Sequence, residues 1–190
     1  MKIAVIGTGN IGRTLGGRWS TAGHDVVYGS RSGSGEGPAG PALTSVAEAL
    51  AGADAVVLAV PGPAVAGVAA ANGAALAGKV VIDAANRIGE PEVNSRAAIA
   101  AAAPQAQYVR AFNTLGWENF ADPPAGAAMF FAADPGARQV AEELITAVGL
   151  EPVYAGGASA SGTVDALLPL WFALVKHNAG QRRTALGIMK

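Results

Sequence analysis

The chain has 190 residues, of which 51% are apolar and only 14% are charged. This much apolar material can build a sizeable core, which excludes a disordered chain. The 13 basic and 14 acidic residues nearly cancel, so we expect no general binding to a nucleic-acid backbone. The chain has no cysteine and its two histidines lie far apart, so neither a disulfide nor a zinc site is expected.

Both the N-terminus and the most apolar segment favour a soluble protein. Only four apolar residues separate Lys2 from Gly7, which is too few for the core of a signal peptide. The apolar run 166–175 contains Pro169 and is ten residues long, whereas a helix that crosses a membrane needs ~20. We therefore expect a cytoplasmic protein without a membrane partner.

Short runs rich in β-branched residues alternate with longer segments rich in Ala and Leu, which is the pattern of repeated β–α–β units. Residues 55–60 are apolar on both faces, as in a strand of a parallel sheet that helices cover on both sides. The pattern predicts an α/β protein with a doubly wound, mostly parallel sheet. The expected strands are 2–6, 25–28, 55–59, 80–82, 107–111, 128–132 and 151–154, and the expected helices are 11–22, 43–50, 63–76, 91–103 and 135–148.

Two segments depart from this alternation. Residues 32–41 are rich in Gly, Ser and Pro, which predicts a mobile loop. Residues 162–185 read as a terminal helix that is apolar on nearly all sides, so it must be covered by the crevice of its own sheet or by a second copy of the chain. We expect both, in a homodimer. Residues 1–155 would form the nucleotide-binding domain, and 156–190 a helical segment of the same compact unit.

A glycine-rich turn follows the first strand directly and opens the first helix, the context in which this pattern binds a dinucleotide. Its first glycine permits the tight turn, its second lets the backbone approach a pyrophosphate, and its third lets the helix pack close to the strand. The N-terminus of the helix then offers free N–H groups to the anion. The turn is Gly7-Thr8-Gly9-Asn10-Ile11-Gly12.

The end of the second strand indicates which dinucleotide is bound. An NAD site would place Asp or Glu there to accept hydrogen bonds from the ribose 2′-hydroxyl. This chain has no acid at that point and instead reads Ser30-Arg31-Ser32. A guanidinium can bind a 2′-phosphate through two donors, and both hydroxyls can donate to the same phosphate. NADP(H) is therefore predicted in preference to NAD(H).

Three runs make the chain resemble the NADP oxidoreductases that depend on coenzyme F420. They are the glycine-rich turn, the Gly-Ser-Arg-Ser run at 29–32 and the Ala-Phe-Asn-Thr run at 111–114. The same module is similar to the cytoplasmic reductase domain of six-transmembrane metalloreductases. The resemblance implies a Rossmann fold that binds NADP(H), and a small-molecule electron acceptor such as F420.

The resemblance also implies roles for individual residues. The pyrophosphate would lie on Thr8, Gly9, Asn10 and Ile11, and the 2′-phosphate on Ser30 and Arg31. Val60 and Pro61 would lie along the ribose and nicotinamide. The run 112–117, with Asn113, Thr114 and Trp117, would be the loop over which the nicotinamide and the acceptor ring stack. F420-reducing members carry a histidine at the position of Asn113 and a small residue at that of Trp117, so FMN or FAD is also considered as the acceptor.

Polar residues at the carboxyl ends of later strands are further candidates. The Asn113 amide would orient the nicotinamide carboxamide or a ring carbonyl, or else it satisfies the backbone of a turn. Asp83 and Asn86 would serve the ribose or cap a turn. His177 would be a proton donor or simply a cation at the end of a helix, whereas His24 is expected to be structural.

The acceptor side of the site is less well marked. Trp117, Phe120 and Trp171 would form an aromatic box for a flat acceptor or would be core and dimer contacts. The chain shows no constellation for acid–base or nucleophilic catalysis, which fits hydride transfer between stacked rings. The alternatives are a non-catalytic NADP-binding module that senses redox state or regulates a partner, and a dehydrogenase of hydroxy acids or imines whose crevice a partner chain completes.

Overall fold

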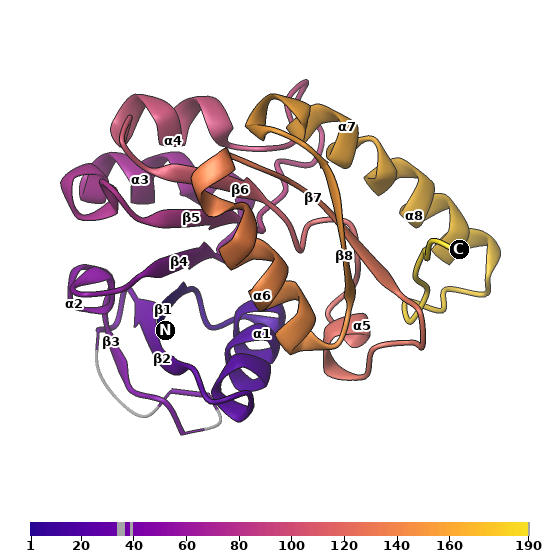
Figure 1. The fold of residues 1–190 in the computed structure, drawn as a ribbon, viewed down its shortest axis with the longest axis horizontal. Coiled ribbons are helices and arrows are strands. Elements are labelled where there is room, and N and C mark those ends of the chain that lie inside the picture. The colour runs from indigo at the N-terminus through magenta and orange to yellow at the C-terminus, as the bar shows by residue number, and fades with distance from the viewer. Residues whose placement is uncertain (34–36, 39, 190) are drawn as a thin grey trace.

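A β-sheet of eight strands runs through the centre of the molecule, and helices cover both of its faces (Figure 1). The computed structural model describes residues 1–33, 37–38 and 40–189. The strand order is β3-β2-β1-β4-β5-β6-β7-β8. The strands are β1 (Lys2–Ile6), β2 (Asp25–Ser30), β3 (Leu43–Ser45), β4 (Ala55–Leu58), β5 (Val80–Asp83), β6 (Gln107–Arg110), β7 (Ala128–Ala133) and β8 (Glu151–Gly156).

The first six strands in this order are parallel, with Ile3 of β1 opposite Val26 of β2 and Ala55 of β4. Only the contact between β6 and β7 is antiparallel, and β8 is parallel to β7. The prediction of a doubly wound, mostly parallel sheet is thus confirmed. The strand order reverses between β1 and β4, and sheets of this type bind ligands at that point.

Both faces of the central strands are buried, as their uninterrupted apolar sequences predict. In β1, Ile3 and Val5 pack into a core under α1 (Asn10–Thr21), α6 (Arg138–Val148) and α8 (Leu167–His177). Ala4 and Ile6 point into a second core on the opposite face. That face is covered by α2 (Val46–Leu50), α3 (Gly62–Leu76) and α4 (Arg96–Ala102).

Three predicted helices begin later than expected, and one of them is α6, which the 3₁₀ turn η1 (Pro135–Ala137) precedes. The segment 43–50 starts as strand β3, because Ser45 accepts a hydrogen bond from the Glu48 N–H, Glu48 bonds back to the Ser45 N–H, and the helix begins only after this cap. The segment 91–103 becomes helical only at Arg96, because Asn94 caps the Arg96 N–H and the Ser95 N–H is held by Asp83. The stretch between the expected strands 107–111 and 128–132 contains the short helix α5 (Glu118–Ala121).

The terminal helix is shorter than predicted and is broken. After the 3₁₀ turn η2 (Ala158–Ala160), α7 (Ser161–Asp165) is separated from α8 by Ala166, and α8 ends at His177. The following residues turn back over the molecule, where the Trp171 indole N–H donates to the Thr184 carbonyl at 2.8 Å and the Ala128 N–H donates to the Leu186 carbonyl at 2.8 Å. Residues 178–189 therefore form a tail that lies along the start of β7.

By length and composition alone, the segment Ala158–His177 could cross a membrane. In the fold it packs against the sheet through Val164, Leu168 and Trp171, and it carries the buried carboxylate of Asp165. The predicted mobile loop 32–41 falls partly on residues 34–36 and 39, outside the described residues.

Candidate dinucleotide site

A cleft of about 550 Å³ opens at the carboxyl ends of β1, β2 and β4, where the strand order reverses. The glycine-rich turn forms its floor, and the ends of β2 and β4 form its two sides. No Asp or Glu lines it among the described residues. Predicted site residues that line it are Gly7, Thr8, Gly9, Ser30, Arg31, Ser32, Val60 and Pro61.

Each glycine of the turn meets a different requirement. Gly7 has a φ of +112°, and a Cβ there would overlap the Ala59 carbonyl oxygen. A Cβ at Gly12 would overlap the carbonyl oxygen of Gly7, so α1 packs against the turn only because Gly12 has no side chain. A Cβ at Gly9, in contrast, would meet nothing within 4 Å. The open space beside Gly9 lets a ligand approach the backbone.

The N-terminus of α1 is available to an anion. Gly9 is the residue that precedes the helix, so no side chain caps the first N–H groups, and the first turn contains no acid. The Arg13 guanidinium reaches back to the Thr8 carbonyl oxygen at 3.3 and 3.4 Å from Nη2 and Nε, which supports the turn from the helix side. Unsatisfied N–H groups and the helix dipole together favour a phosphate at this point.

The end of β2 places two hydroxyls and a guanidinium together. Ser30 Oγ and Ser32 Oγ lie 2.8 Å apart, and the Gly33 N–H donates to Ser30 Oγ at 3.3 Å. Arg31 is exposed and forms no ion pair within the part of the chain that the structure describes. These groups, predicted for the 2′-phosphate, therefore lie on the same wall of the cleft.

Beyond β4 in the strand order, at the ends of β5 and β6, lies a buried polar cluster that we call the Arg110 network. Arg110 ends β6 and is fully buried, and its Nε donates to Asp165 Oδ1 at 2.7 Å. Its Nη2 donates to Asn86 Oδ1 at 2.7 Å, and its Nη1 lies 3.4 Å from Asp83 Oδ1. Asn113 Nδ2 donates to the same Asp165 Oδ1 at 3.0 Å. The network thus joins β5, β6 and α7.

Asp83 is held from several directions within this network. Its carboxylate accepts hydrogen bonds from the N–H groups of Ser95 (2.7 Å) and Ala85 (3.2 Å) and from the Tyr108 hydroxyl (3.1 Å). Burial raises the pKa of Asp83, and the Arg110 charge opposes that rise. Burial and the nearby Asp83 raise the pKa of Tyr108. Asp83 is therefore fully buried inside the network, and it is not among the residues that line the cleft.

The network contains residues that the sequence analysis missed, above all Arg110 and Asp165. Their signal is an opposite pair of charges inside otherwise apolar segments, Tyr-Val-Arg-Ala and Thr-Val-Asp-Ala-Leu-Leu. Charged residues of that kind are buried only when they are paired. The pattern cannot show which buried charge meets which, because 55 residues separate these two.

The predicted acceptor residues do not form an open aromatic box. Phe120 is buried in the core, where its ring packs edge-on against Phe112 with centroids 5.7 Å apart. Trp171 is buried as well, under the Arg182 guanidinium, whereas Trp117 is 37% exposed. Phe120 and Trp171 are therefore core residues. Thr114 is buried near Asn113, and Asn10 and Ile11 open α1.

The two histidines also lie away from the cleft. His177 is exposed at the end of α8, and His24 Nδ1 lies 3.5 Å from the Met1 amino group. No described residue of α7 or α8 lines the cleft, so the expected closure of the crevice by the terminal helix is not seen in one chain. Figure 1 shows α8 beside β7 and β8, at the opposite end of the sheet from β2.

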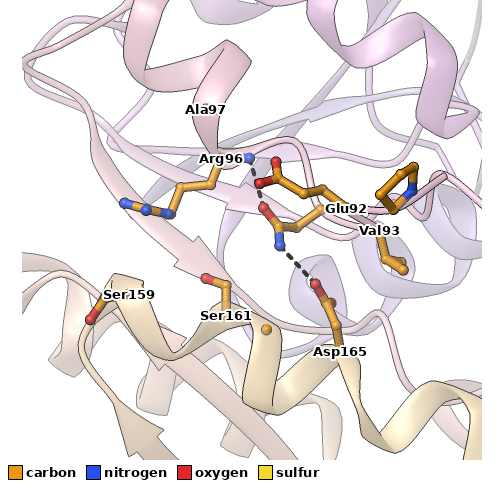
Figure 2. A pocket seen from close by; sticks show the side chains of 10 residues that line it. Glu92, Val93, Arg96, Ala97, Ser159, Ser161 and Asp165 are labelled. Carbon is orange, nitrogen blue, oxygen red and sulfur yellow. Dashed lines mark hydrogen bonds between the residues drawn. The ribbon is translucent and has the colours of Figure 1, made fainter.

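A second, smaller groove of about 280 Å³ lies between the β5–α4 loop and α7 (Figure 2). Arg96, Ser159 and Ser161 line it, and Asp165 lies at one end. Asn94 Nδ2 donates to Asp165 Oδ2 at 2.7 Å, so the carboxylate faces the groove with one oxygen and the Arg110 network with the other.

Solved structures of similar fold include one that matches over the whole chain. A candidate F420-dependent NADP reductase from Arthrobacter sp. FB24 is 26% identical with a TM-score of 0.83, and the match covers 100% of both chains. A hypothetical protein from Sinorhizobium meliloti is 28% identical with a TM-score of 0.71, covering 85% of this chain and 88% of that one.

A reductive aminase from Aspergillus terreus, solved with NADPH, shares the fold alone. It is 20% identical with a TM-score of 0.70, and the match covers 93% of this chain but 62% of the aminase. No curated protein sequence matches the chain.

The family described as "NADP oxidoreductase coenzyme F420-dependent" matches residues 2–87. This range contains the glycine-rich turn, the Ser30-Arg31-Ser32 run and the Val60-Pro61 turn, which are the parts of the chain that line the cleft. The resemblance expected from the sequence is thus confirmed, and residues 2–87 match the family of coenzyme F420-dependent NADP oxidoreductases.

Proposed function

We propose that this protein is an NADPH-dependent oxidoreductase that transfers hydride between NADP(H) and a flavin or deazaflavin, with F420, FMN or FAD as the candidate acceptors. The observation that carries the proposal is the cleft itself, in which an open glycine-rich turn lies beside two hydroxyls and a guanidinium. Among the residues that the structure describes, this guanidinium forms no ion pair and no acid lines the cleft. The match of residues 2–87 to an F420-dependent family supports the acceptor class.

The chain's own residues would then divide the dinucleotide between them. Gly9 and the first N–H groups of α1 would bind the pyrophosphate, and Ser30, Arg31 and Ser32 the 2′-phosphate. Val60 and Pro61 would lie along the ribose and the nicotinamide. The nicotinamide end of the dinucleotide would lie near Asn86, Asn113, Thr114 and Trp117. When bound, the nicotinamide supplies the hydride, so the protein needs to orient the ring and exclude water.

The first test is a calorimetric titration with NADPH and NADH. We expect NADPH to bind at least ~10-fold more tightly, about 1.4 kcal/mol, and Arg31→Ala to remove that preference while NADH binding stays the same. Arg138→Ala is the matched control, because Arg138 is an exposed arginine on α6 that pairs with Glu142. Equal affinity for the two dinucleotides in the wild type would contradict the NADP assignment.

The acceptor is tested by following NADPH oxidation with F420, FMN and FAD in turn. Turnover with any of them supports the oxidoreductase. Tight NADPH binding without turnover would instead favour the alternative, a non-catalytic NADP-binding module that senses redox state or regulates a partner. The exposed Trp117 is the aromatic residue of the predicted box that remains accessible to an acceptor ring.

We also propose that the protein is a cytoplasmic homodimer without a nucleic-acid or membrane partner. Leu170 and Phe172 of α8, on either side of the buried Trp171, are 46% and 45% accessible, and a second copy could cover them. Light scattering during gel filtration measures the mass directly. Leu170→Glu together with Phe172→Glu is expected to convert a dimer to a monomer, and a monomeric wild type would contradict the proposal.

A further inference from the structure

The groove between the β5–α4 loop and α7 is separate from the candidate dinucleotide cleft. No residue that the structure describes lines both of them. The β5–α4 loop and the start of α4 form one side of the groove, and η2 and α7 form the other (Figure 2). Its volume is about 280 Å³. Pockets for drug-sized ligands begin at about 300 Å³, so this groove suits only a small molecule.

One end of the groove presents the carboxylate of Asp165, which is 7% exposed. Its Oδ1 accepts hydrogen bonds from Arg110 Nε at 2.7 Å and from Asn113 Nδ2 at 3.0 Å. Its Oδ2 accepts one from the neutral Asn94 amide, at 2.7 Å. A carboxylate oxygen can accept two hydrogen bonds, so Oδ2 has room for a further donor.

Two more groups that line the groove can only accept at neutral pH. The carboxylate of Glu92 is exposed and forms no hydrogen bond or ion pair with the part of the chain that the structure describes. The Ser161 hydroxyl uses its hydrogen on the Ala158 carbonyl oxygen at 2.6 Å, which leaves its lone pairs. These groups and Asp165 together favour a ligand group that carries several N–H donors and a positive charge.

Arg96 and Ser159 line the groove with the opposite chemistry. Arg96 begins α4, and Figure 2 shows its side chain extending on the side of Ser159, away from the Asp165 carboxylate. Neither the Arg96 guanidinium nor the Ser159 hydroxyl has a partner within residues 1–33, 37–38 and 40–189. A guanidinium binds a carboxylate through two parallel N–H donors, and a hydroxyl can add a third donor.

The two signs of charge together restrict what the groove can bind. A simple anion would face the carboxylates of Asp165 and Glu92, and a simple cation would face Arg96, so either would meet a like charge. The described residues also contain no group of three or more His, Cys, Asp or Glu that could hold a metal ion. A small molecule that carries one ammonium and one carboxylate matches both ends.

We propose that this groove binds a small amino acid as its zwitterion. The ammonium group lies against Asp165 and Glu92, and the carboxylate accepts hydrogen bonds from Arg96 and Ser159. The inference goes beyond the proposed function and does not depend on it, because no residue of the groove is assigned to NADP(H) or to its acceptor.

The test is calorimetric titration of the full chain, without dinucleotide, against a series of unbranched amino acids. The series is glycine, β-alanine, γ-aminobutyrate and δ-aminovalerate, in which the two charges lie progressively further apart. We expect at least one of them to bind with a Kd of ~1 mM or tighter. The two analogues of the best binder that carry a single charge, one without the carboxylate and one without the ammonium, should bind at least ~10-fold more weakly.

Variants test each end of the groove. Arg96→Met should weaken binding of the best amino acid at least ~10-fold, because it removes the paired N–H donors. Arg138→Met is the matched control, since Arg138 is an exposed arginine on α6, outside the groove, and it should keep the wild-type affinity. Asp165→Asn should weaken binding at least ~10-fold. If that variant does not fold, the exposed Glu92→Gln tests the same end, with an expected loss of about threefold.

Three results would overturn the inference. The first is no binding of any amino acid of the series at ~10 mM. The second is a single-charge analogue that binds as tightly as the amino acid, since only one end of the groove would then be used. The third is an equal loss of affinity in Arg96→Met and Arg138→Met, which would place the binding outside the groove. A parallel titration with NADPH tests the proposed function separately, so the failure of one leaves the other intact.

Discussion

The two ends of the candidate dinucleotide site are built by different means. At β1 and β2 the site consists of backbone, glycines and exposed polar side chains that cost the fold little. At β5 and β6 it borders a cluster of buried charges whose members hold one another. Exposed residues at the first end, such as Gly9 and Arg31, can therefore be changed to alter binding alone, whereas residues at the second end carry stability as well as position.

The largest expected effect is at the buried end. Arg110→Met removes the cation that faces both Asp83 and Asp165 and leaves two carboxylates uncompensated. Breaking a buried pair in this way destabilises a fold by about 3–5 kcal/mol. Denaturant unfolding measures the loss, and Arg138→Ala on the surface of α6 should leave the unfolding midpoint unchanged. If Arg110→Met changed the unfolding midpoint as little as Arg138→Ala does, the buried end would not contribute more to stability than the open end.

A pair of glycine substitutions sharpens the comparison within the open end. A Cβ at Gly12 would overlap the Gly7 carbonyl oxygen, so Gly12→Ala should cost about 1–3 kcal/mol of stability and disturb the turn. Gly9→Ala meets no protein atom, so its cost should stay under about 1 kcal/mol. It should nevertheless weaken NADPH binding at least ~10-fold, because the new methyl group lies where the ligand approaches.

Gly9→Ala must change NADPH binding much more than stability if the space beside Gly9 is reserved for the ligand. Stability is measured by thermal unfolding without ligand, and binding by titration with NADPH. If Gly9→Ala lost stability as Gly12→Ala does, the space beside Gly9 would belong to the fold. If Gly9→Ala bound NADPH as tightly as the wild type, the pyrophosphate would lie elsewhere.

The smallest expected effect concerns Tyr108 and pH. Its hydroxyl donates to Asp83, so Tyr108→Phe should cost about 1 kcal/mol at neutral pH. Because the folded-state pKa of Tyr108 is raised above its ordinary value of 10.0, its contribution is complete below pH 10 and declines above it. The wild type should thus lose stability above pH 10 more steeply than the variant. Parallel pH profiles would show that Tyr108 ionises in the fold as it does in the unfolded chain.

The sequence predicted that the residues at the open end of the candidate site lie together, because that end depends on local features. The turn from Gly7 to Gly12 and the hydroxyls and guanidinium at 30–32 are continuous in sequence, and the structure brings them to one cleft. The shorter helices also have local causes, and the Ser45–Glu48 cap could have been found in the sequence.

The buried end could not be predicted in the same way. Its central contact joins Arg110 to Asp165, and pairing of this kind follows from how α7 packs on the sheet. The amide of Asn113 looked free to orient a ligand in either sense, yet its direction is fixed by a carboxylate 52 residues away. Residue type gives the chemistry of such a group, but only tertiary packing gives the atom that it presents.

The separation of Arg110 from Asp165 has a consequence for synthesis of the protein. Ribosomes extend a chain by about 5–20 residues per second, so the 55 residues between these two partners take about 3 to 11 seconds to make. During that interval β6 carries an arginine whose carboxylate on α7 has not yet been made, although the residues that form the open end of the cleft have all emerged. The nascent chain therefore completes its glycine-rich turn before it can close its own core.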